Sequence, residues 1–114
     1  MTTKYSIKAT SVFKLSLTKL DSFLTRKFSE TVARKAKRAI STKVQSQLSN
    51  NPHSAPQSDR LLALGLAEYR QLLVDDHNIV FFRVDESTKT VILLLVIDSR
   101  QDLEKLLFEV NLLF

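Results

Sequence analysis

The hydrophobic pattern of the first fifty residues predicts one strand followed by two helices. Residues 5–10 alternate apolar and polar side chains with a period of two, which is typical of a half-buried strand. From about Ser16 to Phe28, apolar residues recur every three or four positions, which predicts an amphipathic helix. Ser29 can cap a second helix running to about Leu48, because its hydroxyl can accept a hydrogen bond from a helix N-terminal N–H. The apolar stripe expected on this second helix consists of Val32, Ala36, Ile40, Val44 and Leu48. The short connection between the helices predicts an antiparallel hairpin.

The pattern of the second half predicts three strands. Residues 49–59 contain both prolines and form a loop, and residues 61–66 form an apolar patch of undefined structure. Residues 69–74, 79–84 and 91–97 are strand-like. The third of these runs is continuously apolar, as expected for a central strand covered on both faces. Polar turn residues at 75–78 and 85–89 join the strands, so neighbouring strands should pair antiparallel.

A last helix follows, for which Asp98 or Ser99 can provide the cap. Its apolar positions are Leu103, Leu106, Leu107, Val110, Leu113 and Phe114. The predicted fold class is α+β, in the order β-α-α-β-β-β-α. An N-terminal strand precedes an antiparallel helical hairpin, which packs on a four-stranded, mainly antiparallel sheet in two layers, and a C-terminal helix ends the fold. Residues 1–114 are expected to form a single domain.

Composition excludes several classes of chemistry. The chain has no cysteine, which excludes disulfides, cysteine-ligated zinc, iron–sulfur clusters and a thiol nucleophile. A single glycine excludes a glycine-rich phosphate loop. His53 and His77 lack metal-ligand spacing, so we expect neither a metal site nor a cofactor. The N-terminus has no secretory pattern and the longest apolar run is too short to cross a bilayer, so we expect a cytoplasmic protein without a membrane partner.

The net charge of +5 is unevenly distributed. Residues 1–43 carry eleven Lys or Arg against two acids, a net charge of +9, whereas residues 44–114 carry six against ten, a net charge of −4. This asymmetry suggests a polyanion or an acidic protein as partner, or else two solvated surfaces of opposite sign. A basic run on the second helix lies off the apolar stripe and has no aromatic residue beside it, which favours an acidic protein segment over nucleic acid. It consists of Arg34, Lys35, Lys37 and Arg38.

Three arginines occur in or just after predicted strands. Arg70, Arg83 and Arg100 either extend from the sheet to solvent or share a functional face. The adjacent acids Asp75 and Asp76 are typical of a solvated turn.

The strand region resembles the RelE/ParE superfamily of bacterial type II toxins. The resemblance rests on three segments, which are EYRQLLV at 68–74, HNIVFFRVD at 77–85 and VILLLVIDSRQDL at 91–103. The superfamily pattern comprises an Arg-bearing strand, a strand similar to YRVxYRVD, an apolar strand and an R-x-D-L-like start of the last helix. The motifs cover about residues 65–107, and the first fifty residues agree in element order alone.

The resemblance implies one of two activities. RelE-like members cut mRNA on the ribosome with basic and aromatic groups, whereas ParE-like members inhibit DNA gyrase without a reaction of their own. This chain has His77 and Asn78 in place of the Tyr-Arg pair, Leu72 in place of a lysine, and Leu106 in place of an aromatic residue. The resemblance therefore implies a ParE-like toxin of a chromosomal or plasmid module, neutralised by a small, acidic, partly disordered cognate antitoxin.

Candidate residues follow from this interpretation. Arg70, Arg83 and Arg100 are candidates for effector contacts. The basic run of the second helix is the candidate antitoxin surface, together with Leu103, Leu107 and Val110, for which core packing is the alternative. A ribosome-dependent mRNA endonuclease would use Arg70 and Arg100 with His77 as general base, since its unperturbed pKa is about 6.5. A third alternative is a non-catalytic module that binds nucleic acid through the basic hairpin, with steep salt dependence.

Overall fold

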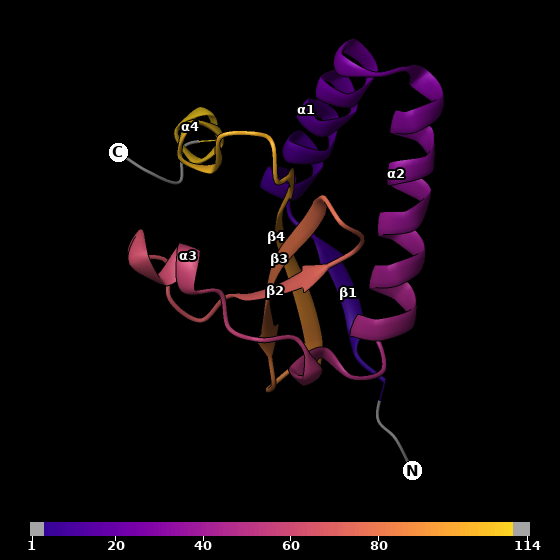
Figure 1. Cartoon of the computed structure of the whole chain (residues 1–114). Helices are drawn as coiled ribbons and strands as arrows, with labels where there is room; N and C mark the ends of the chain where they lie inside the picture. Colours follow the sequence, from indigo (N-terminus) through magenta and orange to yellow (C-terminus); the bar gives the residue numbers. More distant parts are fainter. Residues whose placement is uncertain (1–3, 111–114) are drawn as a thin grey trace.

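Four strands form one mixed sheet in the computed structural model, which describes residues 4–110 (Figure 1). The strands are β1 (Ser6–Ala9), β2 (Arg70–Leu73), β3 (Asn78–Asp85) and β4 (Thr90–Asp98). Their spatial order is β1-β4-β3-β2. The three consecutive strands pair antiparallel, while β1 pairs parallel with β4. The prediction of a four-stranded, mainly antiparallel sheet is confirmed.

The helical hairpin consists of α1 (Ser11–Lys27) and α2 (Glu30–Lys43). Ser29 caps α2 as predicted, because its hydroxyl accepts from Val32 N at 3.2 Å. The predicted start of the first helix is wrong by five residues, since Thr10 caps α1 by accepting from Phe13 N. The hydrophobic pattern missed the start of α1 because Ser16 is polar, although its side chain is fully buried. Its hydroxyl donates to Phe13 O and accepts from Val96 N of β4 at 3.0 Å.

The hairpin packs on one face of the sheet and forms the larger apolar core. A π-helical segment, Val44–Leu48, extends α2 to the predicted end. Val32 is an error in the predicted stripe, because 40% of it is exposed, whereas Ala33 is buried. The buried stripe of the second helix is Ala33, Ala36, Ile40, Val44 and Leu48.

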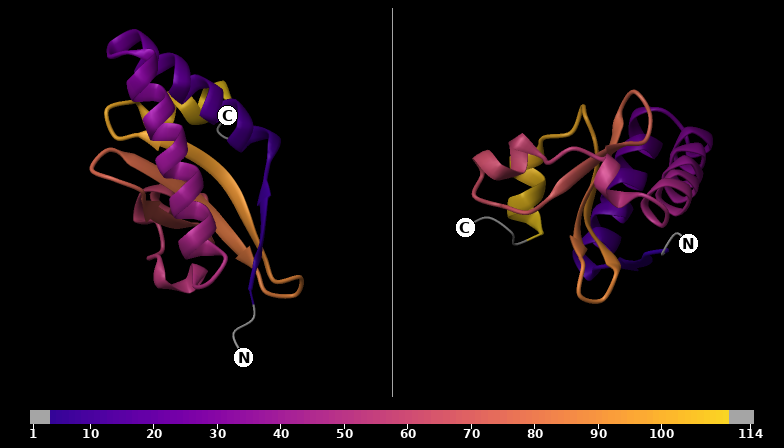
Figure 2. Two further views of the ribbon diagram at one scale, coloured as in Figure 1. Left: turned by 90° about the vertical axis from the view of Figure 1, so that its right-hand side faces the viewer. Right: turned by 90° about the horizontal axis from the view of Figure 1, so that it is seen from below.

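The opposite face of the sheet carries a third layer that was not predicted. It consists of the short helix α3 (Asp59–Ala63) and of α4 (Leu103–Glu109), and Figure 2 shows these helices across the sheet from the hairpin. A 3₁₀ turn, Pro52–Ser54, lies in the loop that precedes α3. The apolar patch at residues 61–66 contributes Leu61, Leu64 and Leu66 to the core under this layer. The two-layer prediction is therefore corrected to three layers.

The central strands β3 and β4 are covered on both faces. Val80, Phe82 and Val96 contact the hairpin core, whereas Phe81, Leu95 and Ile97 belong to the core under α3 and α4. A register shift between Phe81 and Phe82 places one extra residue in β4. The prediction that the continuously apolar strand is covered on both faces is confirmed.

The last helix begins later than predicted. Asp102 caps α4 by accepting from Lys105 N, because the carboxylate of Asp98 is bound to Arg100 instead. The predicted positions Leu113 and Phe114 lie outside the described residues. Among residues 4–110, no helix is long and apolar enough to cross a membrane.

Candidate functional site

The end of β4 is organised around Arg100. Its Nε and Nη2 donate to the carboxylate of Asp98 at 2.8 and 2.6 Å, and the Asp98 side chain is fully buried. Burial raises the pKa of Asp98, but the hydrogen bonds and charge of Arg100 outweigh burial and hold it below 3.8. The guanidinium also lies over the ring of Phe28, 4.6 Å from the ring centre. Arg100 is therefore fixed by contacts to its own chain.

The turn between β2 and β3 lies beside Arg100. Asp75 Oδ1 accepts hydrogen bonds from His77 N and Asn78 N, and both of its oxygens accept from Asn78 Nδ2. Burial raises the pKa of Asp75, and these hydrogen bonds outweigh burial and lower it below 3.8. The carbonyl of His77 accepts from Ser99 N at 2.7 Å, which ties the turn to the residue before Arg100. The side chain of His77 is exposed.

Arg70 lies apart from these residues. It pairs with Phe82 in the sheet, and Phe82 pairs with Leu93. Asp98 lies five positions after Leu93 in β4, which corresponds to about 16 Å along the strand. Arg70 Nη1 donates to Ala55 O at 2.6 Å and to His53 O, so it holds the loop against the sheet edge. The structure thus brings His77 and Arg100 together and places Arg70 elsewhere.

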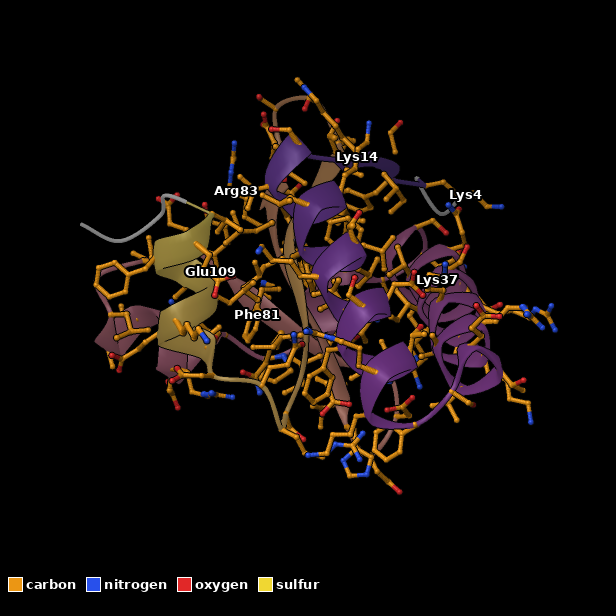
Figure 3. All side chains as sticks on the ribbon, turned by 90° about the horizontal axis from the view of Figure 1, so that it is seen from above. Lys4, Lys14, Lys37, Phe81, Arg83 and Glu109 are labelled. Atoms are coloured by element: carbon orange, nitrogen blue, oxygen red, sulfur yellow. The ribbon has the colours of Figure 1, made fainter. Side chains whose placement is uncertain are left out.

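Arg83 lies on the other face of the sheet. It follows Phe81 by two residues in β3, and Phe81 belongs to the core beneath α4. Figure 3 shows Arg83 on the side of α4, whereas Lys37 of α2 lies on the opposite side of the view. No side-chain hydrogen bond or ion pair of Arg83 is found within residues 4–110. The three strand arginines therefore share no common face, and Arg83 is the one that keeps its donors available.

The basic run of α2 lies at the surface of the molecule. Arg34, Lys35, Lys37 and Arg38 are all exposed. Lys37 lies 3.5 Å from Asp21 of α1. Arg34 and Lys37 line a groove of about 1080 Å³ between the hairpin and α4, to which Lys19 and Lys105 also contribute. The groove contains acids as well, and Lys19 pairs with Glu109 across it at 2.7 Å.

The apolar candidates on the last helix lie in the core. Leu103 and Leu107 of α4 and Val110 at its C-terminal cap are buried in the core between α4 and the sheet. The exposed apolar residue of this helix is Phe108, at 53% exposure. Their burial agrees with the alternative of core packing. An antitoxin contact by these three residues stays a prediction.

The sequence analysis missed one polar cluster. Glu86 in the β3–β4 turn accepts from Tyr5 at 2.9 Å and from Lys89 at 2.6 Å, and it contacts His53 Nε2. Hydrogen bonds from Lys89, His53 and Tyr5, in that order of size, lower the pKa of Glu86 to about 2. These residues are separated by up to 84 positions, so no local motif could reveal the cluster. Within residues 4–110, no group of three or more His, Cys, Asp or Glu residues could hold a metal ion.

Comparisons with known proteins define the family. The family model of the ParE toxin of the type II toxin–antitoxin system parDE matches residues 7–103. A chain of the chromosomal ParDE toxin–antitoxin system from P. aeruginosa has a similar fold, with a TM-score of 0.66 at 18% identity over 83% of this chain and 96% of that chain. A chain of the RelBE2 toxin–antitoxin complex from Mycobacterium tuberculosis gives a TM-score of 0.61 at 18% identity over 83% of this chain and 98% of that chain. No curated protein sequence matches the chain. Because the family model covers most of the sequence, the chain belongs to the ParE toxin family of type II toxin–antitoxin systems.

Proposed function

We propose that this ParE-family toxin acts in the cytoplasm by binding DNA gyrase, and that a cognate antitoxin neutralises it. The observation that carries the choice of gyrase is the position of Arg70. A ribonuclease of the RelE type requires its basic groups around one phosphate, because they must stabilise charge that develops there. Arg70 is instead bound to backbone carbonyls, several residues along the sheet from His77 and Arg100. A toxin that acts by binding requires no such assembly.

The antitoxin is proposed to bind the basic side of the hairpin. Arg34 and Lys37 face the groove beside α4, and Lys35 and Arg38 extend the positive surface along α2. An acidic segment that is disordered when free can fold onto such a surface. Electrostatic complementarity of this kind raises the association rate and suppresses wrong partners.

Arg83 is proposed as the principal gyrase contact among the three strand arginines. Its donors are available, whereas Arg70 donates to the carbonyl of Ala55 and Arg100 donates to the carboxylate of Asp98. Arg83 also lies on the α4 face, away from the basic side of the hairpin. Gyrase and antitoxin would then contact different regions, and neutralisation would require the antitoxin to block or reshape a distant face.

A supercoiling assay with purified gyrase tests the proposal. We expect inhibition at micromolar concentrations of the full chain, and relief of inhibition when the cognate antitoxin is added. The matched control is a second topoisomerase, which should remain active. Absence of inhibition, together with mRNA cuts mapped in a translating extract, would overturn the choice of gyrase.

The second candidate function is ribosome-dependent mRNA cleavage. One observation favours it, which is that His77 and Arg100 lie at the same end of the sheet and are joined through the His77–Ser99 hydrogen bond. A general base and a cation are two of the groups that such cleavage needs. His77→Gln separates the two functions, since it should abolish mRNA cleavage and leave gyrase inhibition intact.

A further inference from the structure

One apolar residue of the central strand β4 is not covered by either helical layer within residues 4–110. Ile92 is partly exposed, whereas the other residues from Val91 to Ile97 are buried. Ile92 also belongs to neither of the two apolar cores. Its neighbours Val91 and Leu93 contribute to the core under the hairpin, so the side chain of Ile92 faces the side of α3 and α4. Figure 1 shows these helices beside the upper part of the strands, whereas the turn between β3 and β4 lies at the lower end. The sheet around Ile92 therefore presents an accessible surface.

Two cations flank Ile92 on the neighbouring strands. Its partner in β1 is Lys8, and its partner in β3 is Arg83. Ile7 and Ala9 pack against the hairpin core, so Lys8 lies on the same face of the sheet as Ile92 and Arg83. Because adjacent strands are about 4.8 Å apart, the Cα atoms of the two cations are about 10 Å apart. These three residues are termed the cationic row.

Neither cation of the row is engaged by the described part of the chain. Among residues 4–110, no side-chain hydrogen bond or ion pair of Lys8 or Arg83 is found. The adjacent row of the sheet contains one acid, Asp85, which pairs with Thr90. Asp85 Oδ1 accepts from Ser87 N at 3.0 Å and from the Ser87 hydroxyl at 2.6 Å, so this carboxylate is used within its own turn. The cationic row thus offers two positive charges on either side of an apolar side chain.

We propose that the cationic row is the docking surface for an acidic segment of gyrase, in which an apolar side chain lies between two carboxylates. The apolar side chain packs on Ile92, and the carboxylates pair with Lys8 and Arg83. Complementary charges guide association and fix the register, while burial of Ile92 contributes affinity. The inference rests on the proposed function, because it takes gyrase as the partner. It adds Lys8 and Ile92 to the contact at Arg83, and it states the chemistry that gyrase presents.

The composition of the row favours a protein over a nucleic acid. A nucleic-acid strand requires cations that follow its phosphates, together with aromatic side chains on which its bases stack. The row instead places an isoleucine between its two cations, and the adjacent row adds the acid Asp85. The proposed antitoxin surface on α2 belongs to the hairpin, which lies across the sheet from this face (Figure 2). Gyrase and the antitoxin therefore have separate surfaces of different chemistry.

Reversal of one charge tests the electrostatic part of the proposal. Lys8→Glu should raise the concentration of the full chain needed for half-inhibition of gyrase about tenfold, because it places like charges opposite each other. Lys14→Glu makes the same change of charge at an exposed position of α1. It is the matched control and should leave inhibition unchanged. Lys8→Arg keeps the charge and should retain inhibition.

Replacement of Ile92 tests the apolar part. Ile92→Thr keeps the branched side chain that suits a strand and should weaken inhibition about fivefold, because less apolar surface is buried against gyrase. Leu73→Thr is the matched control, since Leu73 is 58% exposed on β2 and lies outside the row. Circular dichroism and thermal denaturation establish that each variant is folded. Lys8 is exposed, so Lys8→Glu provides the test even if Ile92→Thr unfolds the sheet.

Unchanged inhibition by Lys8→Glu, while the unaltered chain inhibits gyrase, would overturn the inference and leave the proposed function standing. Two further results would assign the row to another occupant. Self-association of the chain that Ile92→Thr abolishes in sedimentation would identify a second copy, and oligouridine binding that Lys8→Glu abolishes would identify a nucleic acid. If the unaltered chain does not inhibit gyrase, the proposed function fails and the inference fails with it. The two failures are therefore distinguishable.

Discussion

The basic helix α2 and the arginines of the sheet place the same kind of side chain in opposite situations. Arg34 and Arg38 are exposed on α2, and no ion pair holds them in the described part of the chain. Arg70 and Arg100 donate to backbone carbonyls and to a buried carboxylate. Arg34 and Arg38 can bind a partner without breaking internal contacts. Arg70 and Arg100 must first release theirs. Position in the fold, and not residue type, therefore separates the cations that remain available from the structural ones.

The largest expected effect is on stability at the sheet end. Arg100→Ala should lower the free energy of unfolding by about 2–4 kcal/mol, because it leaves the buried carboxylate of Asp98 without its partner. Arg34→Ala should change it by no more than about 0.5 kcal/mol. Chemical denaturation measures both. The double variant of Arg100→Ala with Asp98→Asn should regain part of the lost free energy of unfolding. Equal losses for Arg100→Ala and Arg34→Ala would contradict the comparison.

The next effect is on antitoxin binding. Replacing Arg34 and Arg38 by Glu should weaken the complex about thirtyfold, because two attractive contacts become repulsive. The matched control replaces Lys8 and Lys14 by Glu, which makes the same change in net charge elsewhere. Calorimetry with the purified antitoxin measures both affinities. If the control variant loses as much affinity, net charge and not the α2 surface determines binding.

A smaller effect concerns the strand arginine that has no internal partner. Arg83→Ala should weaken gyrase inhibition about tenfold and change the free energy of unfolding by no more than about 0.5 kcal/mol. Lys14→Ala removes an exposed cation from α1 and serves as the matched control in the supercoiling assay. Full inhibition by the Arg83 variant would assign the gyrase contact to another surface.

The smallest effect is on the pH dependence of stability. The pKa of Glu86 is lowered from 4.5 to about 2, so its contribution is present above about pH 4.5 and is lost as pH falls towards 2. The lowered pKa of Asp98 adds to this loss below about pH 3.8. Glu86→Gln should flatten the acid limb of the stability curve, while Glu104→Gln should retain it. Carboxyl NMR shifts that place the Glu86 titration near pH 4.5 would contradict this assignment.

The elements with a long hydrophobic pattern could be predicted from the sequence. Continuous apolar residues identified β4, and the cap at Ser29 fixed the start of α2. The short helix α3 was missed because five residues carry too little periodicity. The start of α1 was misplaced because Ser16 is a buried polar residue whose partner, Val96 N, lies in a distant strand.

The site was less predictable than the fold. The basic run of α2 could be identified because four neighbouring residues carry it. The engagement of Arg70 with Ala55 could not, because it depends on how the loop folds back against β2. The exposure of Ile92 depends on how much of the sheet α3 and α4 cover, which the apolar run of β4 does not determine. Local pattern therefore predicts elements, while contacts across the sequence decide which cations remain available.

One measurement tests the central claim that this toxin acts by binding gyrase and does not cut RNA. The chain is induced in bacterial cells, and plasmid supercoiling and mRNA 5′ ends are determined in the same culture before growth stops. The account predicts relaxed plasmid and no new mRNA ends, and it predicts that co-expression of the antitoxin restores plasmid supercoiling. New mRNA ends within codons, with supercoiling unchanged, would contradict it.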